Sequence, residues 1–186
     1  WVVGNYPRVG IVHRNRLWAF LDHRAYASDD DDHEQFLSGG LQFPVGPGEA
    51  ERIIAATVYK KRLFVFKKPG GVYVLIDDDA DFVNWYFTKV SDEFGASGPD
   101  AQVTALDDLL VANSSGTITS YRAVNQQEGE VSGGDIFSLM KIEKFMQDQM
   151  SSDDLDQRRM IYHEEGKTVL FSFRSRGGII NDRTLR

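Results

Sequence analysis

The feature that most constrains the fold of this chain is a hairpin-like segment that recurs along it. The segment KRLFVFKKPGGVYVL (61–75) contains two apolar runs separated by a Lys-Lys-Pro-Gly-Gly turn. A shift of 46 residues aligns IVHRNRLWAFL (11–21) with TVYKKRLFVFK (57–67), and the same shift again reaches TALDDLLVANSSGTITSY (104–121). A looser fourth copy, RRMIYHEEGKTVLFSFR (158–174), lies about 51 residues beyond the third. Internal repeats of this length are typical of arrays of small β-sheets.

Each copy has the composition of paired β-strands. In GVYVLI (71–76) and TVLFSF (168–173), β-branched and aromatic residues suit a pleated surface, and the turns carry glycine or Pro69. We therefore expect a mainly β fold, a β-propeller-like array of antiparallel blades with a repeat of about 46 residues and one inserted helix. A β-sandwich with regularly spaced hairpins is the alternative. The side chains expected inside the sheets are Leu17, Trp18, Leu63, Val65, Tyr73, Leu109, Val111 and Ile118.

The whole of 1–186 is predicted to be a segment of one propeller-type domain. Its repeat units are expected near residues 3–37, 52–90, 101–124 and 157–186. Three to four units are too few for most closed rings, and the first residue is Trp1, so we expect a longer chain or sheets completed by other chains.

A helical insertion is predicted at 134–150, where Ile136, Leu139, Met140, either Phe145 or Met146, and Met150 approximate one apolar face. We interpret it as an amphipathic helix laid on a sheet, and a partner-binding helix is the alternative.

Composition excludes several classes of function. The chain has 21 basic and 28 acidic residues, a formal charge of −7, and its basic residues are scattered, so binding to nucleic acid through its phosphates is not expected. There is no cysteine, hence no disulfide and no thiolate chemistry. No apolar run approaches the roughly 18 residues of a membrane span.

Candidate chemical motifs are weak. The run SDDDDHEQF (28–36) lacks the ligand spacing of a calcium loop and predicts a solvated loop, as does IDDDADF (76–82). The histidines His13, His23, His33 and His163 have no metal-site spacing, and a tertiary cluster of His23 and His33 with Asp30 or Asp32 is the alternative. No nucleophile elbow is present, and the carboxylate pair Glu49 and Glu51 is not interpreted as catalytic. We predict no enzyme activity, no catalytic or metal-binding residue and no cofactor.

Basic residues group around two of the repeats, at positions that would be equivalent in neighbouring blades. They are either partner contacts or solvated edges that prevent strand pairing between molecules. The candidate partner-contact residues are Arg14, Arg24, Lys60, Lys61, Lys67 and Lys68.

Residues 7–124 resemble the propeller region of bacteriophage tail hub and nozzle proteins, also called phage stabilisation or tail tubular B proteins. The shared pattern is an Arg-Leu-Trp strand, a strand ending in Ser-Asp before an acidic loop, and two further strand motifs. The matching positions are Arg16-Leu17-Trp18, Tyr26-Ala27-Ser28-Asp29 with Phe36, Gly48-Glu49 with Ile53, Leu63 to Lys67, and Gly95 with Gly116-Thr117-Ile118. The chain departs from the pattern in its four aspartates after Ser28, where a glycine-containing turn is commoner, and in the segment 134–150, which has no counterpart.

The resemblance implies a structural role in the virion tail, after assembly in the host cytoplasm. Such proteins form a homo-oligomeric ring beneath the head-to-tail connector, contact other connector and tail proteins, extend the DNA conduit and retain the genome. The DNA would pass through the lumen without sequence-specific binding, and an acidic wall would not hold it. A β-propeller carbohydrate-recognition domain or glycoside hydrolase is the alternative.

Overall fold

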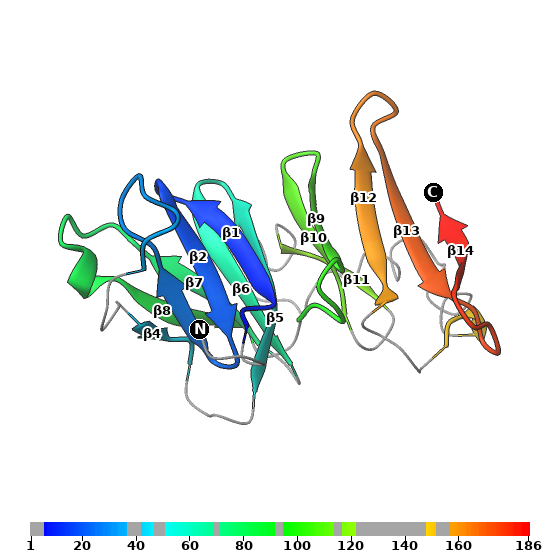
Figure 1. Ribbon diagram of the computed structural model, residues 1–186. Coiled ribbons are helices and arrows are strands. Elements are labelled where there is room, and N and C mark those ends of the chain that lie inside the picture. Colours follow the sequence, from blue (N-terminus) through cyan, green and yellow to red (C-terminus); the bar gives the residue numbers. More distant parts are fainter. Residues whose placement is uncertain are drawn as a thin grey trace. The chain divides into compact units, whose positions relative to one another are not determined.

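A computed structural model gives the fold over residues 6–36, 42–46, 51–68, 71–91, 95–113, 117–121, 148–151 and 157–186. The protein is mainly β, with four antiparallel sheets of three or four strands (Figure 1). Its internal contacts divide the chain into two compact units, Trp1–Glu93 and Phe94–Arg186.

The first unit contains two four-stranded sheets in which every strand pairs with the next along the chain. The first sheet consists of β1 (Val9–His13), β2 (Arg16–Leu21), β3 (Arg24–Ala27) and β4 (Gln42–Pro44). The second consists of β5 (Arg52–Tyr59), β6 (Arg62–Lys68), β7 (Val72–Ile76) and β8 (Tyr86–Ser91), with a short 3₁₀ helix η1 (Phe82–Asn84) before β8. The KKPGG hairpin is therefore the central pair of its sheet, with Val65 opposite Tyr73.

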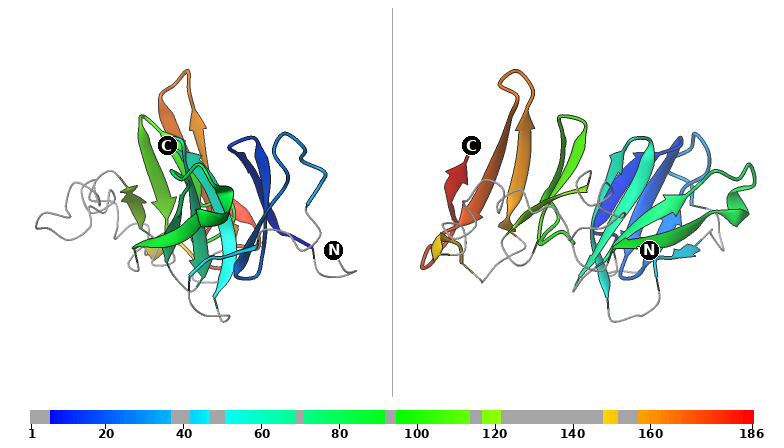
Figure 2. Two further views of the ribbon diagram at one scale, coloured as in Figure 1. Left: turned by 90° about the vertical axis from the view of Figure 1, so that its left-hand side faces the viewer. Right: turned by 180° about the vertical axis from the view of Figure 1, so that it is seen from behind.

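One hydrophobic core lies between these two sheets, which form two layers in Figure 2. Trp18 of β2 is fully buried in it, and its ring centroid lies 5.5 Å from that of Phe43 and 6.0 Å from that of Phe87. The indole Nε1 donates a hydrogen bond of 3.2 Å to the carbonyl of His13, so its polar atom is satisfied. Each large side chain buried here contributes about 1.5–3 kcal/mol to stability. Leu63 and Val65 supply the facing side of β6.

The second unit contains two three-stranded sheets, again with sequential pairing. They consist of β9 (Gln102–Ala105), β10 (Asp108–Ala112) and β11 (Ile118–Ser120), and of β12 (Arg159–His163), β13 (Thr168–Arg174) and β14 (Asn181–Leu185). The backbone N–H of Met160 donates to the carbonyl of Asp100 at 2.8 Å, which joins β12 to the segment before β9. Buried Leu109, Val111 and Phe173 show that both sheets have an apolar face.

In three sheets, the same kind of two-residue turn connects the first strand to the second. Arg14–Asn15, Lys60–Lys61 and Leu106–Asp107 all have positive φ, between 47° and 63°, and connect the first strand of a sheet to the second. Two consecutive residues of positive φ are typical of the type I′ hairpin turn, whose twist matches that of the strands. The turns are spaced by 46 residues, the interval of the sequence repeat.

The mainly β fold and the antiparallel hairpins predicted from the sequence are confirmed. The expected sheet residues are buried, except Leu17, which is half-buried. The fourth hairpin is more distant than expected: β10 begins at Asp108 and β13 at Thr168, 60 residues later, because a long segment separates β11 from β12. The predicted helix at 134–150 lies outside the described residues, apart from 148–150. Over the part of the chain that is described, no helix is long and apolar enough to cross a membrane.

Candidate functional site

The predicted partner-contact residues lie at opposite ends of their sheets. Arg14, Lys60 and Lys61 occupy the turns between first and second strands, where both lysines are exposed. Arg24 begins β3 and Lys68 ends β6, beside the turns that follow the second strands. Because alternate turns of a meander lie at opposite ends, the six residues do not form one basic band.

The two arginines of this set have side-chain partners within the first unit, a neutral one for Arg24 and an acidic one for Arg14. The Arg24 guanidinium donates to Gln42 Oε1 on β4 at 2.8 Å, and Arg14 Nε donates to Asp77 Oδ2 at 2.9 Å. The Arg14 side chain is 51% exposed, so part of its charge remains available to solvent.

Lys67 differs from the prediction because it is fully buried. Its Nζ donates to the carbonyl of Val45 at 2.7 Å and lies 3.4 Å from Glu51 Oε2, a distance typical of an ion pair. A partner cannot reach this ammonium group. The alternation of side chains along a strand could have predicted this burial. Lys67 lies on the same face of β6 as Leu63 and Val65, which are both in the core.

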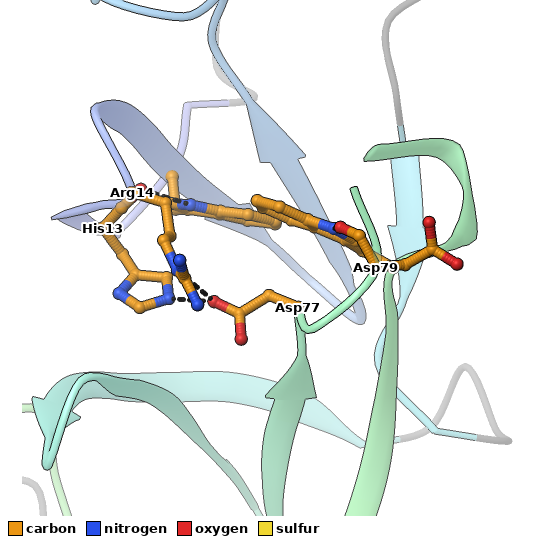
Figure 3. Close-up of polar contacts among 6 residues, drawn as sticks. His13, Arg14, Asp77 and Asp79 are labelled. Carbon is orange, nitrogen blue, oxygen red and sulfur yellow. Dashed lines mark hydrogen bonds and ion pairs between the residues drawn. The ribbon is translucent and has the colours of Figure 1, made fainter. Parts of the chain in front are cut away.

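The most developed polar cluster consists of His13, Arg14 and Asp77 (Figure 3). His13 ends β1, Arg14 begins the following turn, and Asp77 comes directly after β7. Asp77 Oδ2 lies 2.8 Å from His13 Nε2 and accepts the bond from Arg14 Nε. His13 and Asp77 are both buried, whereas Asp79 points away from the cluster. The cluster connects the first sheet to the second within the core region.

A buried His–Asp pair also occurs in catalytic sites, where the histidine activates a hydroxyl or thiol. In the described residues, the His13 ring has Asp77 as its hydrogen-bond partner and contacts no serine or threonine hydroxyl in this way. The two contacts to Asp77 hold the β1–β2 turn against the end of β7, and we call this cluster the clamp. No short sequence pattern predicts this pair, because the two side chains are 64 positions apart.

The acidic run 28–36 is a loop, as predicted, whereas the run 76–82 differs from the predicted solvated loop because Asp77 is buried and bonded to His13 and Arg14. Asp30, Asp31 and Asp32 are exposed, and the N–H of Asp31 donates to the carbonyl of Asn15 in the β1–β2 turn. No group of three or more His, Asp or Glu side chains that could hold a metal ion occurs within the described ranges. His23 and His33 therefore do not join Asp30 or Asp32 in such a group.

In the second unit, a buried arginine connects the two sheets. Arg158, directly before β12, is 4% exposed, and its guanidinium donates to the carbonyl of Asn113 at 2.7 Å. Burial of the charged form lowers the pKa of Arg158 to about 10. The contact attaches the end of β10 to the start of β12.

No family model matches the chain, and a search of curated proteins finds no match.

Proposed function

We propose that this chain forms consecutive blades of a β-propeller and serves as a structural component of a phage tail. In this role it belongs to a hub or nozzle ring that extends the DNA conduit and retains the genome until ejection. Its partners are further copies of itself and other connector and tail proteins.

The observation that carries the proposal is the regular recurrence of one sheet-forming hairpin. Type I′ turns at Arg14–Asn15, Lys60–Lys61 and Leu106–Asp107 connect the first two strands of three successive sheets. Propeller blades are meander sheets of this kind, repeated at roughly 40–50 residues. The motif resemblance over residues 7–124 adds the tail assignment to this architecture.

A structural rather than enzymatic role agrees with how the polar groups are used. The best candidate for chemistry, the His13–Arg14–Asp77 cluster, uses its hydrogen bonds to connect two sheets. The formal charge of −7 favours a conduit wall from which DNA is repelled.

Mass measurement of the intact protein in solution, together with negative-stain imaging, tests the proposal. We expect a closed ring of several copies with a central channel, alone or with purified connector proteins. A protein that stays monomeric even beside these partners would contradict it. Specific binding on a glycan array would instead support sugar recognition.

A further inference from the structure

The connection between β13 and β14 presents two adjacent isoleucines to solvent. Ile179 is 87% exposed and Ile180 69% exposed. Single exposed apolar residues are common, but a pair of large β-branched side chains at one loop forms a local apolar surface of the kind that binds partners.

Hydrogen bonds fix the backbone of this connection. Asp182 accepts from the N–H of Ser175 at 2.8 Å and from its hydroxyl at 2.6 Å. The N–H of Gly178 donates to the carbonyl of Ser175 at 2.9 Å, and Arg174 Nε donates to the carbonyl of Gly178. Because the loop is held on both sides, little ordering entropy remains to be lost when a partner binds.

Basic residues flank the two isoleucines in the sequence. Between residues 174 and 186 there are four arginines and one acidic residue, Asp182, in a chain that is acidic overall. We call the exposed residues of this region, Arg176, Ile179, Ile180 and Arg183, the C-terminal patch. Its chemistry matches a partner surface that combines carboxylates with apolar side chains.

The first unit has a surface of that composition between β7 and the start of β8. Residues 77–88 contain no lysine or arginine. The guanidinium of Arg16 lies over the Phe82 ring and donates a hydrogen bond to the carbonyl of Ser28. Since this bond goes to a carbonyl, it does not neutralise the negative charge of the nearby exposed aspartates. The exposed residues that form this acidic patch are Asp78, Asp79, Asp81, Val83 (63%) and Tyr86 (56%).

We propose that the C-terminal patch of one copy of this chain docks on the acidic patch of a second copy. This inference rests on the ring assembly proposed above. A ring requires two different, mutually complementary surfaces on each copy, because head-to-tail contacts close by rotation whereas a self-complementary contact stops at a dimer. The chain has one surface of each kind, complementary in charge and apolar on both sides.

Charge reversal on each patch tests the contact. Arg183→Glu and Asp78→Lys should each weaken assembly about 10- to 100-fold, because each places like charges opposite one another. When the two variants are mixed in equal amounts, they should assemble again. One interface then pairs the glutamate introduced at position 183 with the lysine introduced at position 78, and the next interface pairs the native Arg183 with the native Asp78. Restoration in the mixture excludes misfolding as the cause of the loss. Replacing Ile179 and Ile180 by serine should also prevent assembly.

Matched controls reverse exposed charges outside both patches. Arg62→Glu and Glu165→Lys should leave the ring unchanged by sedimentation and negative-stain imaging. Rings that persist in Arg183→Glu and Asp78→Lys would overturn this contact and leave the proposed function standing. Failure of the mixed variants to associate, either as rings or as open chains, would also overturn it. A wild-type protein that never forms rings would overturn both proposals.

Discussion

At the scale of single residues, Gly46 is the position where the fold depends most directly on the absence of a side chain. It has φ of +72°, and an added Cβ would overlap the ring and hydroxyl of the buried Tyr73. Gly46→Ala should therefore lower the free energy of unfolding by about 2–4 kcal/mol. Gly177 is the matched control, with φ of +84° but open space around it, and Gly177→Ala should cost only about 1 kcal/mol. Equal losses in chemical denaturation would contradict the steric argument.

Asp182 gives a residue-scale prediction on pH. The hydroxyl of Ser175, followed by its backbone N–H, donates to the carboxylate and lowers the pKa of Asp182. Because the native pKa lies below the unfolded value, the stabilisation is complete above about pH 3.9 and is lost as pH falls through the native pKa. Ser175→Ala removes the hydroxyl donor and should raise the Asp182 titration midpoint, measured by NMR. An unchanged midpoint would contradict this account.

At the scale of elements, the β5–β6 turn contains avoidable strain. Lys60 and Lys61 both have positive φ, which glycine adopts without the steric cost of a Cβ. Lys61→Gly should raise the free energy of unfolding by about 0.5–1 kcal/mol, since the type I′ turn favours Gly at its second position. Glu165→Gly in the β12–β13 turn has no such strain to relieve and should be neutral or destabilising. Denaturant midpoints of both variants measure the difference.

The clamp between the two sheets of the first unit depends on the charge of Asp77. Asp77→Asn replaces two charge-assisted hydrogen bonds with weaker ones and leaves Arg14 without its counter-ion, which should cost about 2–3 kcal/mol in unfolding free energy. Asp78→Asn, one position along and exposed, should change stability by less than about 0.5 kcal/mol. Similar effects at both positions would show that the clamp contributes nothing specific.

The elements could be predicted because their causes are local. Alternating apolar residues and turn composition act over a few positions, so the repeat placed Arg16, Arg62 and Asp108 in register, and each begins the second strand of its sheet. The contacts that matter at the candidate site are not local. The burial of Lys67 and the pairing of His13 with Asp77 arise only when two sheets pack together, and no short pattern specifies that packing.

At the scale of the whole molecule, charge is distributed unevenly along an acidic chain. Exposed aspartates gather in two loops of the first unit, at 30–32 and 78–81, whereas four of the seven arginines in the second unit lie within 174–186. Unlike charges on different units favour association between copies, and the excess of acid opposes contact with polyanions.

The acidic excess leads to a prediction on DNA. At about 10 µM protein, a concentration within the range of ordinary non-specific binding, the intact protein should not retard duplex DNA in a gel, because a charge of −7 provides no net phosphate neutralisation. Replacing Asp30, Asp31, Asp32 and Asp78 by lysine raises the formal charge from −7 to +1, since each exchange adds two, and should produce retardation that high salt abolishes. Retardation by the wild-type protein would show that DNA adheres to it and would count against the proposed role as a conduit wall.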